Sequence, residues 1–133
     1  MDKPSERVYK MAVKNFLLEE NQAIWDAYYD NAINGFSEEE NPEEFAKKKV
    51  SLAQYKCGVL AFEQYVKKSF DEITATDIES FAEHTDKKNK LAHVNAFLLT
   101  SVSNGYINNT DTEFLISLLP KEYKKIGRMI AEI

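Results

Sequence analysis

The sequence predicts an all-α fold, a small helical bundle of about five to seven helices. Apolar residues recur at spacings of three and four along most of the chain, which is the period of one helical face. No segment shows the strict alternation of apolar and polar residues that marks a half-buried strand. The 133 residues include only 4 Gly and 3 Pro, too few for the many turns of a β-sandwich or barrel.

Length and composition set further bounds. A chain of 133 residues with 44% hydrophobic and 29% charged side chains has the composition of one folded domain with its own core. No apolar run approaches the ~20 residues of a membrane span, and the opening MDKPSERVYK lacks the apolar stretch of a signal peptide. The single Cys can form no internal disulfide. We therefore expect a cytoplasmic protein with no membrane partner.

Charge is distributed unevenly along the chain. Residues 1–45 carry 11 acidic and 4 basic side chains, whereas the whole chain has a net charge of −5. A negative total argues against a sequence-independent nucleic-acid binder, which usually has a positive excess. We expect an acidic helical N-terminal extension, residues 1–44, that forms one compact unit with a mildly basic domain, residues 45–133.

The acidic extension is expected to hold two helices, at about 5–19 and 22–34, separated by a break at Glu20-Asn21. It also carries four aromatic residues: Trp25, Tyr28, Tyr29 and Phe36. Their helical spacing indicates that these aromatic side chains pack in the core. The alternative is that they form, with the acidic residues, an exposed surface for a protein partner.

Local signals place the remaining helices. Asn41 and Pro42 predict the start of a helix that continues to Lys68, with an interruption near Ser51. Thr74 to Asp77 is a capping-box variant that opens a short helix. The next helix spans about 87–104 and ends at Asn104-Gly105.

Two more helices are predicted at the C-terminal end. One follows the cap cluster 108–111, and the last starts at Pro120. This last helix has an apolar stripe of Tyr123, Ile126, Ile130 and Ile133. We expect the stripe to pack back on the bundle, because small domains bury terminal helices when they can; the alternative is that it meets a second copy of the chain.

Residues 51–109 contain an ordered set of motifs. Tyr55, Val59, Phe62 and Tyr65-Val66 lie along the long helix, and ITATDIESF follows at 73–81. A helix start rich in lysine comes next, and the sequence Gly-Tyr-Ile-Asn-Asn closes the region at 105–109. This order resembles the N-terminal core-binding (SAM-like) domain of tyrosine recombinases, the phage-type integrases. The resemblance covers somewhat under half of the chain and implies a helical DNA-binding scaffold.

The sequence lacks the catalytic residues of that family. Tyrosine recombinases use an Arg, a His-x-x-Arg pair and a Tyr nucleophile, whereas this chain holds only Arg7 and Arg128, neither with a His three residues before it. There is no P-loop, GxGxxG or GxSxG motif. The two His and Cys57 do not have metal-ligand spacing, and a buried structural thiol is the expected role of Cys57. We expect no enzymatic activity, metal, cofactor or small-molecule substrate.

The resemblance implies a DNA contact at the first turn of the helix at 87–104. The residues assigned in this way are Lys87, Lys88, Asn89 and Lys90, with His93 one turn further on and Lys56 on the preceding long helix. The lysines would neutralise phosphates, and Asn89 would reach a base edge. A solvated helix face is the alternative, because most exposed lysines have no other role.

Two functions therefore stay open. The first is a non-catalytic DNA-binding accessory or regulatory domain of the kind encoded by a phage or other mobile element, with double-stranded DNA as its partner. The second is a protein–protein interaction module on a recombinase-like helical scaffold without DNA binding, with the acidic N-terminal third as the contact surface. Steep salt dependence would separate the two, because only phosphate neutralisation requires it.

Overall fold

The computed structural model describes residues 14–85 and 88–131, and these residues form helices and loops without a strand. The helices are α2 (Glu19–Ile33), α3 (Pro42–Val66), α4 (Ala75–His84), α5 (Lys88–Ser103), α6 (Thr112–Ser117) and α7 (Lys121–Ala131), with a 3₁₀ turn η1 at Phe70–Glu72. The predicted all-α bundle is confirmed, with six α-helices among the described residues. None of these helices is long and apolar enough to cross a membrane.

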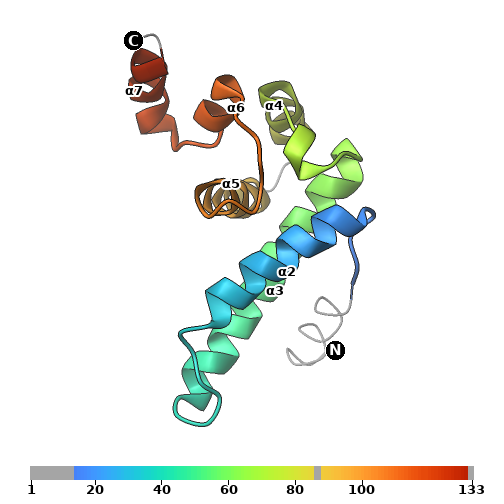
Figure 1. The fold of residues 1–133 in the computed structure, drawn as a ribbon, viewed down its shortest axis with the longest axis vertical. Helices are drawn as coiled ribbons and strands as arrows, with labels where there is room; N and C mark the ends of the chain where they lie inside the picture. Colours follow the sequence, from blue (N-terminus) through green and yellow to red (C-terminus); the bar gives the residue numbers. More distant parts are fainter. Residues whose placement is uncertain (1–13, 86–87, 132–133) are drawn as a thin grey trace.

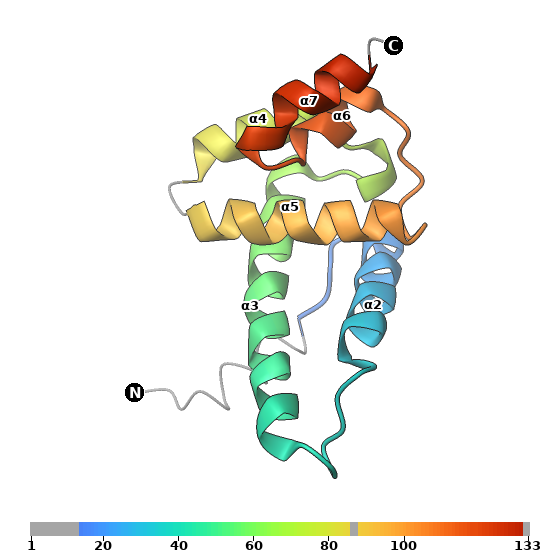
Figure 2. The same ribbon diagram turned by 90° about the vertical axis from the view of Figure 1, so that its left-hand side faces the viewer.

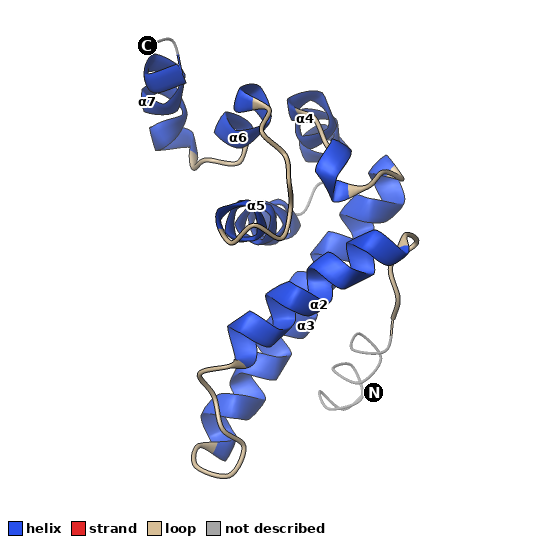
Figure 3. Ribbon diagram, viewed as in Figure 1, coloured by secondary structure: helices blue, strands red, loops and turns tan. Residues whose placement is uncertain are grey.

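The helices are arranged around α3. Helix α2 lies alongside α3 in Figure 1, and α5 crosses both of them near their upper ends in Figure 2. Helices α4, α6 and α7 lie on the other side of α5, and α4 packs on α6. Short loops join most of these elements, as Figure 3 shows. Helix α3 therefore packs against both α2 and α5, and its packing with α5 is the most extensive helix pair in the described part of the chain.

Aromatic rings build the centre of the core. Phe97 of α5 lies 5.5 Å from Trp25, 5.0 Å from Tyr28 and 5.6 Å from Phe70, measured between ring centroids. Trp25 and Tyr28 are buried, which confirms the core interpretation for these two, whereas Tyr29 and Phe36 are partly exposed. The acidic helix α2 thus shares one core with α5, and the expected boundary at residue 44 falls inside α3.

A buried network of two polar side chains joins the start of α2 to α3. Glu63 is fully buried, and its carboxylate accepts hydrogen bonds from Leu17 N at 2.6 Å, Leu18 N at 3.2 Å and Asn21 Nδ2 at 2.8 Å. Asn21 is also fully buried; its Nδ2 donates to Lys68 O at 2.9 Å, and its Oδ1 accepts from Phe70 N at 2.9 Å. We call this the Glu63–Asn21 network. It pairs polar groups that would each cost about 1–3 kcal/mol if they were buried without a partner.

The network explains why the N-terminal prediction was wrong for residues 14–21. The expected helix at 5–19 lies mostly outside the described residues, and residues 14–18 are not helical. The N–H groups of Leu17 and Leu18 bind Glu63 instead, while Phe16 enters the core. Helix α2 continues through the expected break, because Asn21 is a buried network residue and not a helix end.

The other helix ends agree closely with the sequence signals. Thr74 and Asp77 form a complete capping box, Gly105 is left-handed with φ of 80°, and the Asp111 side chain caps α6. Asn41 occupies the cap position of α3, although its side chain makes no capping hydrogen bond. Helix α3 has no interruption near Ser51 and ends at Val66.

Helix α7 does not pack as expected. It contacts α6 near Gly127, where an added Cβ would lie 3.5 Å from Ile116 Cγ1 of α6 and 2.8 Å from Leu119 Cδ1 in the loop that follows. Its apolar side chains are exposed: Tyr123 by 53%, Ile126 by 53%, Met129 by 60% and Ile130 by 66%. The stripe therefore faces away from the bundle over the described residues, and Ile133 lies outside them. An apolar stripe predicts that a helix has a face to cover, but it does not identify what covers that face.

Gly58 lies where α5 crosses α3. A Cβ built on Gly58 would lie 3.3 Å from the carbonyl oxygen of Lys90 and 3.5 Å from Lys90 Cα. Both are backbone atoms of α5, so a side chain at position 58 would have to move the helix itself. The absence of a Cβ thus allows the first turns of α5 to approach the backbone of α3 closely.

We predict that Gly58→Ala lowers the free energy of unfolding, although Ala is favoured over Gly by about 1 kcal/mol in an ordinary helix interior. The steric cost at Lys90 should exceed that gain. Urea unfolding measures the difference, with Gly35→Ala as the control, because a Cβ at Gly35 meets nothing within 4 Å. A Gly58→Ala protein as stable as the wild type would show that the close approach is not a constraint.

Candidate nucleic-acid interface

The first turns of α5 and the middle of α3 form an open groove of about 510 Å³. Its lining consists of Gln54 and Cys57 from α3 and of Lys88, Asn89, Lys90 and His93 from α5. We call it the α3–α5 groove. The sequence predicted six residues for contact with DNA. Four of them, all on α5, lie together in this groove.

Two contacts hold α5 in this position. The first is the close approach at Gly58 described above. The second is the stacking of His93 on Tyr55, with ring centroids 4.2 Å apart and an angle of 19° between the rings. His93 also lines the groove, and Lys88 and Asn89 beside it are exposed.

The electrostatics of the groove favour an anionic partner. The first turn of α5 contains no acidic residue, and neither Lys88 nor Lys90 forms an ion pair with another described residue. Cations at a helix N-terminus oppose the helix dipole and gain nothing locally. A bound phosphate would satisfy both the lysines and the positive end of the helix.

Lys56 lies on a different side of α3. Its side chain is only 5% exposed and faces α2, close to Trp25 and Asp26. Burial lowers the pKa of the Lys56 amine below its ordinary 10.5, and Asp26 partly opposes this shift. Position 56 is one residue from Cys57, or ~100° around a helix of 3.6 residues per turn, so Lys56 is not part of the α3–α5 groove. Lys87 lies outside the described residues.

Sequence reasoning missed the contribution of α3 to the groove. Gln54 was not singled out, and Cys57, expected to be buried, is only partly so. The available signal was the spacing of Gln54, Cys57 and Gly58, which places them on one helical face. Nothing in the local pattern shows that α5 crosses there.

The described residues contain no group of three or more His, Cys, Asp or Glu side chains that could hold a metal ion. No protein-family model, curated protein or solved structure matches the chain. The resemblance to recombinase core-binding domains therefore stays a prediction from the motifs of residues 51–109.

His93 makes the stability of the groove depend on pH. Partial burial lowers the pKa of its imidazole below the ordinary 6.5, so the fold favours the neutral ring. A group with a depressed folded pKa stabilises the fold fully above the unfolded pKa, and this contribution is lost as the pH falls through the folded pKa. We predict that part of the stability lost as the pH falls below the ordinary imidazole pKa of 6.5 comes from His93.

The test compares urea unfolding of His93→Phe with the wild type across this pH range. Phe keeps an aromatic ring against Tyr55 but does not titrate, so the variant should show a smaller loss of stability on acidification. His84→Phe is the matched control, since His84 also stacks on a tyrosine, Tyr65, at 4.5 Å. The same pH dependence in His93→Phe as in the wild type would contradict the assignment.

Proposed function

We propose that this protein is a non-catalytic DNA-binding accessory or regulatory domain that contacts duplex DNA through the α3–α5 groove. The observation that carries the proposal is the convergence of two lysines, Lys88 and Lys90, with two side-chain amides, Gln54 and Asn89, on one open groove. Lysines supply the phosphate contacts that dominate affinity, and amides supply hydrogen bonds to base edges. The motif resemblance of residues 51–109 supports the same turn of α5.

The negative net charge is compatible with this proposal because the acidic cluster is remote from the groove. Glu40, Glu43 and Glu44 line a shallow pocket at the start of α3, at the opposite end of the helix from the crossing with α5 (Figure 2). Pro42 and Gly58 are separated by about 24 Å at 1.5 Å per helical residue. That separation is more than two Debye lengths of ~10 Å at 0.1 M salt, so repulsion of DNA by this cluster is screened.

A second candidate function has its own observation. The exposed apolar face of α7, formed by Tyr123, Ile126, Met129 and Ile130, favours a protein–protein interaction module. This reading needs no contact between DNA and the α3–α5 groove. Binding to duplex DNA is therefore the property that separates the two functions.

We predict that replacing Lys87, Lys88 and Lys90 with Ala abolishes duplex binding measured by fluorescence anisotropy near 50 mM salt. For the wild type, the logarithm of the affinity should fall linearly with the logarithm of the salt concentration. The slope of the variant should be flatter by up to about 3 units, because each lost phosphate contact removes about 0.9 from the slope. Thermal stability should be unchanged or slightly raised, since cations leave an unfavourable helix end.

The control variant replaces Lys47, Lys124 and Lys125 with Ala. It removes the same number of charges from surfaces away from the groove and should keep the wild-type slope. A wild-type protein that fails to bind a duplex at low salt would reject DNA binding and favour the interaction module. Equal losses in the two triple variants would show that DNA does not contact the groove specifically.

A further inference from the structure

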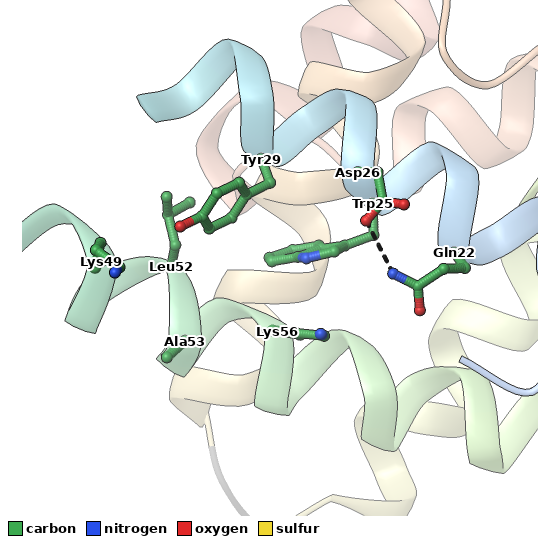
Figure 4. Close-up of a pocket in the computed structure, with 8 residues that line it drawn as sticks. All are labelled: Gln22, Trp25, Asp26, Tyr29, Lys49, Leu52, Ala53 and Lys56. Atoms are coloured by element: carbon green, nitrogen blue, oxygen red, sulfur yellow. Dashed lines mark hydrogen bonds between the residues drawn. The ribbon is translucent and has the colours of Figure 1, made fainter. Parts of the chain in front are cut away.

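A separate pocket of about 280 Å³ lies between α2 and α3 (Figure 4). Trp25 and Tyr29 extend from α2 toward α3, and Leu52 of α3 lies beside Tyr29. The polar part of the lining includes Asp26 from α2 and Lys49 and Lys56 from α3. The pocket therefore combines aromatic surface with two cations and one carboxylate.

Lys56 is the most buried charged member of this lining, with only 5% of its surface exposed. Lys49 lies two helical turns before it on the same face of α3, and its Nζ lies 5.5 Å from the centroid of the Phe45 ring. Asp26 accepts a hydrogen bond from Gln22 Nε2 at 2.9 Å. With two lysines and one carboxylate, the lining of the pocket has an excess of one positive charge.

We infer that this pocket binds a small monocarboxylate with a one-ring apolar body. The size agrees, because a cavity of about 150 Å³ already admits benzene, and the remaining volume has room for a carboxylate. The ring would pack on Trp25 and Tyr29, which provide the flat apolar surface typical of ligand sites. The carboxylate would lie beside Lys56, where a charge-assisted hydrogen bond is stronger than it is in water.

The pocket and the α3–α5 groove are independent sites. Lys56 faces α2, whereas the neighbouring Cys57 faces α5, so the two sites use different faces of α3. Ligand binding in the pocket therefore does not depend on the proposed contact with DNA. A failure of either proposal leaves the other unaffected.

The chain carries its own reporter for this site, because Trp25 is the single Trp and it lines the pocket. Phenylacetate is the probe, and phenylacetamide is its neutral counterpart of nearly equal shape. We expect phenylacetate to change the Trp25 emission saturably and to bind at least tenfold more tightly than phenylacetamide. Excitation at the red edge of the indole band avoids absorption by either probe.

Three variants locate the bound carboxylate. Lys56→Met keeps an unbranched apolar stem without the charge and should weaken phenylacetate binding at least tenfold. Ala53→Leu fills the pocket without changing its charge and should remove binding of both probes. Lys47→Met is the matched control, because Lys47 is exposed on the same helix and does not line the pocket; it should bind phenylacetate like the wild type.

Several results would overturn the inference. Equal affinity for phenylacetate and phenylacetamide would show that no cation recognises the ligand. The absence of a saturable change in Trp25 emission with either probe would show that the pocket is a packing gap. Binding that survives Ala53→Leu would place the ligand elsewhere on the protein. The comparison of the two probes and the Ala53→Leu variant decide the question even if Lys56→Met does not fold.

Discussion

The hydrogen bonds of the buried Glu63 carboxylate and the Asn21 amide are the constraint on which the rest of the structure depends. They fix three segments that are far apart in sequence: the residues before α2, the C-terminal end of α3 and the loop that enters η1. A buried carboxylate is costly unless its oxygens are satisfied, and here backbone N–H groups and one amide satisfy them. Since these partners exist only when α2 lies on α3, the network also specifies this pairing of helices.

The placement of α2 and α5 on α3 then creates both candidate sites. Helix α3 presents Lys56 to α2 and Cys57 to α5, so two neighbouring residues belong to different sites. Phe97 of α5 contacts Trp25 of α2 and Phe70 of η1. These aromatic contacts link the α2–α3 pair to the α3–α5 pair through the core. The same rigid α3 thus supports a polar groove suited to phosphate and an apolar pocket with a buried cation.

The sequence predicted the helix ends that are set by neighbouring residues. It did not predict the environment of side chains whose partners lie far away in the chain. The Thr74 capping box, the helix end at Asn104-Gly105 and the cap cluster at 108–111 are signals within one turn of chain, and each prediction is confirmed. Asn21 resembled a helix break because nothing nearby shows that Glu63, 42 residues away, binds it. Lys56 and Lys88 looked equivalent as lysines on two predicted helices, and only the packing of α2 and α5 on different faces of α3 places them in different sites. The exposed stripe of α7 has the same cause, since a pattern identifies a face but not its neighbour.

Amide hydrogen exchange at Leu17, Leu18 and Phe70 tests most directly the claim that the acidic segment and the α3–α5 region form one cooperative unit. These three N–H groups donate to the Glu63–Asn21 network. The account predicts that they exchange only through global unfolding, with protection equal to that of the Phe97 amide in the core of α5. Exchange of Leu17 and Leu18 that is orders of magnitude faster than that of Phe97 would mean that the N-terminal segment opens independently, and it would contradict the central role of the network.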